Sequence, residues 1–136
     1  MNHENIEIGL RKNGERKIFE NCNFHKSNQE NSVVVFHSFK ECNFRNAFFS
    51  GSVFVFSDFH ASSLITAAFS DCQFIECHFY EVSMRYANFE NSTFVRCTFQ
   101  KCDFSQAIFL KSKWIDSNVI DSNFDPSLLG SYRVGE

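Results

Sequence analysis

The 136-residue sequence is poor in proline and glycine and has no long apolar run. With one Pro and five Gly it offers no flexible linker, so its length fits one domain with its own core. The longest run of large apolar residues, residues 33–36, is far too short to cross a bilayer. The first five residues lack the basic and apolar regions of a secretory signal. We therefore expect a cytoplasmic protein that does not enter a membrane.

A strong charge of either sign is also missing, since 13 basic and 16 acidic side chains give a formal net charge of −3. Proteins that hold nucleic acid by its phosphates carry an excess of Lys and Arg, so no direct nucleic-acid binding is expected. The heavy acidic excess of a protein that imitates DNA is absent as well. Charge therefore indicates no particular partner.

Phenylalanine, in contrast, is abundant and recurs with a period of five residues. The sequence holds 19 Phe, and 16 of them leave the same remainder when their numbers are divided by five. Other apolar residues fill the remaining positions of this series between residues 19 and 129, except at Gln29. Two residues before each centre stands Cys, Ser or Ala, except at Lys17, His37 and Val82. Such biased usage indicates a repeated slot that one side chain fits.

A period of five fits neither an α-helix nor a plain β-strand, but it fits a short extended side followed by a corner. Alternation along such a side turns the centre and the residue two before it in the same direction, which we take as inward. Four sides close a square coil, and successive coils stack at about 4.8 Å through backbone hydrogen bonds. The prediction is an all-β solenoid of about five coils.

The repeat places a small residue and a polar residue before each central Phe. Four examples are Cys22-Asn23-Phe24, Cys42-Asn43-Phe44, Ala87-Asn88-Phe89 and Cys102-Asp103-Phe104. This pattern resembles the pentapeptide-repeat family over roughly residues 20–129. The resemblance implies a right-handed quadrilateral β-helix, to which we assign residues 19–129. It implies little about function, because one fold can carry unrelated activities.

The two ends of a solenoid expose unpaired strand edges, so each needs a cap or a partner. Residues 1–18 depart from the repeat, and the pair Asn13-Gly14 predicts a β-hairpin-like N-terminal cap. Residues 130–136 form a tail too short for a substantial capping helix. A bare last coil predicts a homodimer, as the family resemblance also implies, and a tail folded over a monomer is the alternative. The residues expected at the dimer contact are Phe124, Leu128, Leu129 and Tyr132.

No sequence motif points to catalysis, a cofactor or a metal ion. Four cysteines have a spacing that superficially suggests zinc, namely Cys72, Cys77, Cys97 and Cys102. All six cysteines, however, occupy the inward small-residue slot, so we expect reduced thiols that fill the core. His60, His78 and Asp58 share one side of the coil, where a solvated face is expected. The sequence therefore predicts a protein that is not an enzyme.

The outward positions on one side of the coil are consistently aliphatic. The residues that follow the centres on this side are Val35, Val55, Ile75, Val95 and Ile115. Toward the N-terminus the strip widens to include Val33, Phe36, Val53 and Phe56. An exposed apolar strip marks an interaction site, unless another part of the chain, such as the N-terminal cap, covers it. Strand propensity alone would also place some branched residues here.

These features predict a non-catalytic scaffold that binds another protein, or a second copy, through the aliphatic strip or the C-terminal coil. The alternative, implied by the family resemblance, is a protein that interacts with DNA gyrase or topoisomerase and protects it from quinolones or toxins by imitating DNA. Against it, carboxylates such as Asp71 and Glu90 are interleaved with Lys and Arg and form no acidic stripe. A small enzyme or metal protein is the least favoured hypothesis.

Overall fold

The computed structural model describes residues 16–124, and within this range the regular secondary structure consists of short β-strands. The strands are β1 (Lys17–Glu20), β2 (Val33–Val35), β3 (His37–Lys40), β4 (Val53–Val55), β5 (Asp58–His60), β6 (Gln73–Ile75), β7 (His78–Tyr80), β8 (Thr93–Val95), β9 (Thr98–Gln100), β10 (Lys113–Ile115) and β11 (Asn118–Ile120). No helix of the described part is long and apolar enough to cross a membrane.

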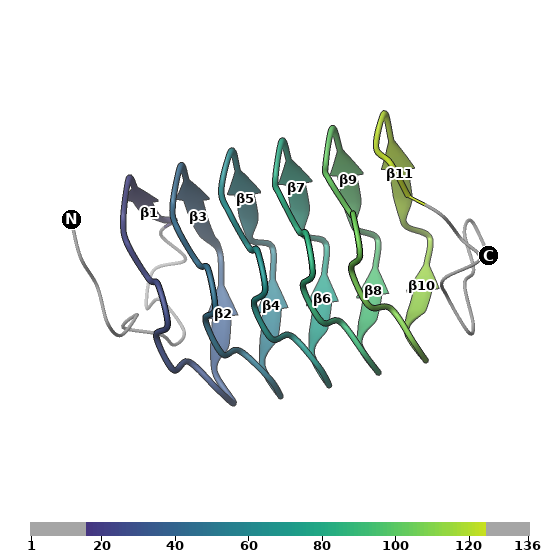
Figure 1. The fold of residues 1–136 in the computed structure, drawn as a ribbon, viewed down its shortest axis with the longest axis horizontal. Coiled ribbons are helices and arrows are strands. Elements are labelled where there is room, and N and C mark those ends of the chain that lie inside the picture. Colours follow the sequence, from purple (N-terminus) through teal and green to yellow (C-terminus); the bar gives the residue numbers. More distant parts are fainter. Residues whose placement is uncertain (1–15, 125–136) are drawn as a thin grey trace.

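The strands form two parallel sheets that run along the whole described part of the chain. One sheet has the order β1-β3-β5-β7-β9-β11 and the other has the order β2-β4-β6-β8-β10. Paired residues lie 20 positions apart, as in Phe39 with Phe59 and Phe59 with Phe79. Each coil therefore contains 20 residues and adds one strand to each sheet, which gives the stack of repeated turns in Figure 1.

The other two sides of the coil are held by isolated bridges rather than strands. Asn23 pairs with Asn43 on one of them, and Asn28 pairs with Phe48 on the other, again 20 residues apart. Most of these sides end in a tight turn, in which the N–H three residues after the centre donates to the central carbonyl, as from Ala47 to Phe44 at 3.0 Å. The coil thus has four sides, which confirms the predicted β-solenoid of about five coils.

The interior is filled by the central residues of the repeats. Every centre from residue 24 to residue 114 is buried, including the exception Gln29. Rings on successive coils stack face to face, as Phe54 on Phe74 at 4.8 Å and Phe79 on Phe99 at 4.5 Å between centroids. Offset-stacked and edge-to-face aromatic pairs are favourable beyond the area that they bury, so the Phe stacks stabilise the stacking of coils.

The small inward residues connect one coil to the next by hydrogen bonds. The hydroxyl of Ser92 accepts the N–H of Cys72 at 3.1 Å and donates to the carbonyl of Phe69 at 2.6 Å, 23 residues earlier. Cysteine thiols make the same backward contact, as from Cys97 to the carbonyl of Phe74 at 3.3 Å. All six cysteines are free and buried. Ser and Cys therefore fill equivalent slots, as the repeat predicts.

Every fifth residue from Asn21 to Asp121 has a positive φ, between 49° and 78°. We call these residues the corner residues. Only one of these corner residues is glycine, Gly51. Left-handed backbone costs an ordinary L-residue about 1 kcal/mol, although Asn and Asp tolerate it. The corners are therefore a recurrent cost of the fold, and bulky residues at them, such as Phe56, require another explanation.

The solenoid begins earlier than the sequence predicted. Lys17 and Ile18, assigned to the N-terminal cap, belong to β1 and pair in parallel register with His37 and Ser38 of β3. Lys17 occupies a slot that small residues fill on most other coils, and its Nζ lies 5.1 Å from the ring centroid of Phe19. Residues 1–15 of the predicted cap, the last residues 125–129 of the predicted β-helix and the tail at 130–136 lie outside the described residues.

Candidate functional site

The aliphatic residues predicted to share one side form a continuous row on the outer face of the β2-β4-β6-β8-β10 sheet. The pairing of the strands places these residues in register from coil to coil, in the order Val35, Val55, Ile75, Val95 and Ile115. We call this row the aliphatic ladder. Ile115 is 40% exposed, and the other four members are half-buried. The ladder is thus an accessible stripe with one branched side chain on every coil.

Near the N-terminus the apolar surface widens on both sides of the ladder. Val33 and Val53 stand on the same strands as Val35 and Val55, and Val33 is 43% exposed. Phe36 and Phe56 follow at the corner with φ of 62° and 53°, and Phe56 is 49% exposed. Neither Phe belongs to the buried core. Two large aromatic side chains thus occupy strained corner positions and stay at the surface.

A shallow groove of about 610 Å³ runs along this corner between the two sheets. Phe36 and Phe56 lie at its apolar end, and the ion pair of Arg96 with Glu76, 2.9 Å between Nε and Oε1, lies toward the other. Arg16 also lines the groove: its guanidinium is 4.2 Å from the ring centroid of Phe36 and 3.0 Å from Asp58. The groove therefore has its two aromatic side chains at the N-terminal coils, with an ion pair beside them and a second ion pair further along.

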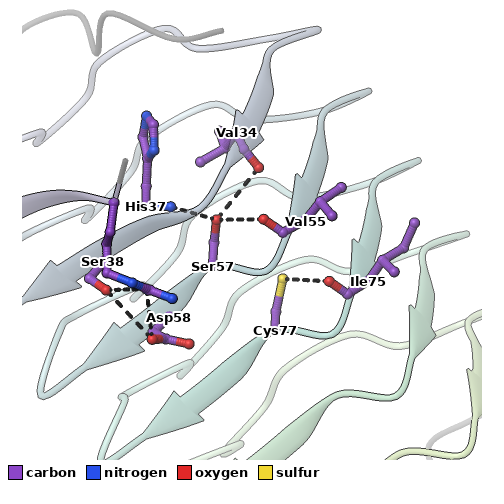
Figure 2. A network of polar contacts seen from close by, with 9 residues as sticks. Val34, His37, Ser38, Val55, Ser57, Asp58, Ile75 and Cys77 are labelled. Carbon is purple, nitrogen blue, oxygen red and sulfur yellow. Dashed lines mark hydrogen bonds and ion pairs between the residues drawn. The ribbon is translucent and has the colours of Figure 1, made fainter. Parts of the chain in front are cut away.

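The neighbouring sheet carries a polar column at its outer surface. Figure 2 shows Ser38 and Asp58, from β3 and β5, facing each other at 3.5 Å. His78 follows on the next strand, since it pairs with Asp58 in the sheet. A nucleophilic triad needs the imidazole between hydroxyl and carboxylate, whereas here the carboxylate of Asp58 stands in the middle. This column therefore does not have the order of a nucleophilic triad.

The inward slots between the two sheets hold small side chains that hydrogen-bond to backbone carbonyls. Figure 2 shows Ser57 contacting the carbonyls of Val34 and Val55, with Cys77 in the same orientation one coil later. Burial raises the pKa of the Cys72 thiol to about 12 and that of Cys42 to about 11, so neither is a ready thiolate at neutral pH. Among residues 16–124 no group of three or more His, Cys, Asp or Glu side chains could hold a metal ion.

Only one of the residues expected at a C-terminal dimer contact lies within the described range. Phe124 is partly buried, and its ring packs on those of Trp114 and Phe104, each 5.2 Å away between centroids. Leu128, Leu129 and Tyr132 lie outside the described residues. The last described coil nevertheless has exposed apolar side chains on two further sides, Leu110 at 48% and Ile120 at 42%.

A four-sided coil of stacked 20-residue turns with a packed Phe interior defines the β-solenoid class of folds. Models described as "Pentapeptide repeats (8 copies)" and "Pentapeptide repeats (9 copies)" match residues 38–71 and 74–112. Together these matches cover more than half of the chain. The chain therefore belongs to the pentapeptide-repeat family. No curated protein matches it in sequence.

Solved structures show the same fold. HetL, a pentapeptide repeat protein involved in heterocyst differentiation regulation from the cyanobacterium Nostoc sp. strain PCC 7120, has a TM-score of 0.67 at 10% identity, over 74% of this chain and 48% of HetL. Rfr23 from the cyanobacterium Cyanothece 51142 has a TM-score of 0.58 at 11% identity, over 79% of this chain and 86% of Rfr23. Trypsin-treated QnrB1, a plasmid-mediated fluoroquinolone resistance protein, has a TM-score of 0.50 at 19% identity, over 87% of this chain and 62% of QnrB1.

This chain thus spans about half the length of HetL. Identities this low show a shared fold and leave the activity of this chain open.

Proposed function

We propose that this protein is a non-catalytic scaffold in the cytoplasm that binds another protein through the outer face of the β2-β4-β6-β8-β10 sheet. The observation that carries the proposal is the aliphatic ladder, which continues over all five strands of the sheet without a polar interruption. On the neighbouring sheet the equivalent positions hold mainly polar residues, including Lys40, His60 and Gln100. Strand propensity alone does not account for such a difference between two sheets of one coil.

The two corner phenylalanines give independent support. Phe36 and Phe56 stand at the corner beside the ladder, and neither belongs to the core. Phe56 is 49% exposed. Large apolar side chains that stay at the surface and extend an apolar stripe are typical of binding sites.

The test is to charge the ladder without touching the core. Val55→Asp combined with Val95→Asp places two carboxylates on half-buried outward positions. The matched control is His60→Asp with Gln100→Asp, which makes the same change at the equivalent positions of the other sheet. In affinity pull-downs from native lysate, wild type and control should retain a common partner that the ladder variant loses. Equal retention by all three proteins, each shown to be folded by circular dichroism, contradicts the proposal.

A second candidate function follows from the fold shared with QnrB1, a fluoroquinolone resistance protein. In that case this chain would interact with DNA gyrase or topoisomerase and protect it by imitating DNA. The corner residues speak against an acidic stripe, since the column that begins at Phe36 continues with Phe56, Glu76, Arg96 and Asp116. A supercoiling assay distinguishes the two functions. Inhibition of gyrase, or rescue of gyrase from a quinolone, supports the second candidate. If the protein shows no inhibition and no rescue, the second candidate is eliminated.

A further inference from the structure

Two columns of side chains flank the aliphatic ladder, and their chemistry changes in step along the solenoid. The leading column, two residues before the ladder on each strand, is Val33, Val53, Gln73, Thr93 and Lys113. The corner column, one residue after the ladder, is Phe36, Phe56, Glu76, Arg96 and Asp116. All of these side chains are at least partly exposed. Both columns are apolar on the first two coils and become polar or charged on the next three.

A particular symmetry brings these two columns together. When two copies face each other across a two-fold axis parallel to the solenoid axis, each coil meets the same coil of the second copy. The rotation reverses the direction across the face, so the leading column of one copy lies over the corner column of the other. The two ladders then lie side by side and interdigitate along the middle of the interface.

We propose that the partner of this face is a second copy of the chain, bound side by side with its solenoid axis parallel and its coils in register. This inference rests on the proposed function and adds the identity and orientation of the partner. It is carried by the chemical match at every coil, from the apolar N-terminal coils to the charged C-terminal ones.

The first two coils bring apolar side chains together. Val33 faces Phe36 of the second copy, and Val53 faces Phe56. The ring of Phe56, which is 49% exposed in the single chain, is covered, which removes apolar area from water. The ring of Phe36 is half-buried and already carries the guanidinium of Arg16, so its contact with Val33 adds less.

The last three coils bring complementary polar groups together. The amide of Gln73 can donate to the carboxylate of Glu76 of the second copy, and Arg96 can donate to the hydroxyl of Thr93. Lys113 faces Asp116 of the second copy, which is a pair of opposite charges. The symmetry repeats each contact, so the charge pair occurs twice in the dimer.

The antiparallel arrangement of the same faces is chemically worse. A two-fold axis along the strands reverses the order of the coils. It would place each column opposite the same column of the second copy, with the third coil facing the third coil. Glu76 would then face Glu76 of the second copy, and Val33 would face Lys113. Like charges in contact and an ammonium group against an apolar side chain both disfavour association. The columns therefore favour the parallel register.

The size of the face predicts a weak dimer. Five coils at about 4.8 Å, and a strand with its corner about 13 Å wide, give a footprint of roughly 300 Å² per copy. A standard stable interface buries about 800 Å² on each side. Self-association should therefore be reversible and visible only at high protein concentration.

Exchange of the Lys113–Asp116 charges tests the register. Lys113→Glu alone, or Asp116→Lys alone, creates two like-charge contacts in each homodimer and should weaken self-association about tenfold at low salt. An equal mixture of the two variants should recover wild-type affinity, because both contacts in the mixed dimer join opposite charges. Sedimentation equilibrium of the full chain gives the three dissociation constants. A mixture that stays as weak as its components overturns the proposal.

An end-to-end contact between the last coils would also be weakened by the Lys113 and Asp116 variants. Cross-linking distinguishes such a contact from the side-by-side dimer. Val35→Cys lies at the opposite end of the ladder from Ile115, and the six native cysteines are buried. A short bis-maleimide should join two copies of this variant, because the parallel register places Val35 beside Val35. Ile75→Cys is the control, since it lies on the middle coil and cross-links in either direction.

Two outcomes overturn the inference in different ways. Cross-linking of the Ile75 variant but not of the Val35 variant shows an antiparallel pair. A chain that stays monomeric and cross-links at neither position shows that the face holds something other than a second copy. In that second case, loss of a pull-down partner by the Val55→Asp, Val95→Asp variant would keep the proposed function and reject only the dimer.

Discussion

Phe74 stands at the middle of the solenoid, and its truncation to Ala should lower the free energy of unfolding by about 3–5 kcal/mol. The side chain is fully buried, and its ring stacks on Phe54 at 4.8 Å and on Phe94 at 5.0 Å with 8° between the ring planes. Removing about 120 Å² of buried apolar area costs about 3 kcal/mol at about 25 cal/mol per Å². The lost stacking and the cavity that remains raise this value toward about 5 kcal/mol.

The assay is urea denaturation followed by far-UV circular dichroism and by tryptophan fluorescence. Trp114 is the single Trp of the sequence, and it is fully buried on β10, two coils beyond Phe74. Each coil of a solenoid contacts only its neighbours, so a weakened middle coil can separate the two halves. Non-coincident transitions in the Ala variant would show such a separation, whereas coincident ones would show a single cooperative unit.

The matched control is Phe74→Leu, because Leu64 already fills an equivalent central slot and is fully buried. Leu keeps most of the volume of Phe but loses the ring stacking, so this exchange should cost about 1.5 kcal/mol, well below the cost of Ala. An Ala variant whose free energy of unfolding lies within about 1 kcal/mol of wild type contradicts the prediction, since a cavity among stacked rings must cost more. A Leu variant that is destabilised as much as the Ala variant contradicts it as well.

Three further predictions concern the slots and corners. Ser92→Ala removes the acceptor of the Cys72 N–H and should cost about 1–3 kcal/mol in urea denaturation, whereas Ser92→Cys, which keeps the backward donor, should cost less. Phe56→Asn should stabilise the fold by about 0.5 kcal/mol, because Asn tolerates left-handed backbone; a destabilisation above about 1 kcal/mol would show that the ring supports the fold. Burial raises the pKa of the Cys42, Cys72 and Cys102 thiols above 9.0, to about 11, about 12 and about 11, so the unfolded chain loses these protons first as pH rises. Stability should therefore be unaffected by these groups below about pH 9 and should fall between about pH 9 and 12, with a shallower fall in Cys72→Ala; identical pH slopes would contradict this.

The position of the aliphatic ladder could be predicted from the constant five-residue period of the sequence. No insertion changes the phase between residues 19 and 129, so residues 20 positions apart must lie on neighbouring coils. The repeat alone therefore predicts that Val55 and Ile75 lie side by side, and their pairing in β4 and β6 confirms it. The burial of the Phe centres and of the six cysteines follows from the same alternation.

The groove at the corner could not be predicted in this way. Arg16 reaches Asp58 across 42 positions, and it covers Phe36 with its guanidinium. A long flexible side chain on the first coil has many directions open to it, and only the packed surface selects one. The strain at Phe36 and Phe56 was also not visible, because Phe is not a residue type that indicates left-handed backbone.

The repeat by itself determined which side chains face inward, how many residues form a coil and which residues meet on neighbouring coils. These properties follow from alternation and a constant period, both of which are local. The tertiary structure decided which two sides become continuous parallel sheets and which two are held by isolated bridges and tight turns. It also decided how far each ladder side chain is exposed and where the corner aromatics stand. These depend on hydrogen bonds and packing between coils, which arise only when the coils are stacked.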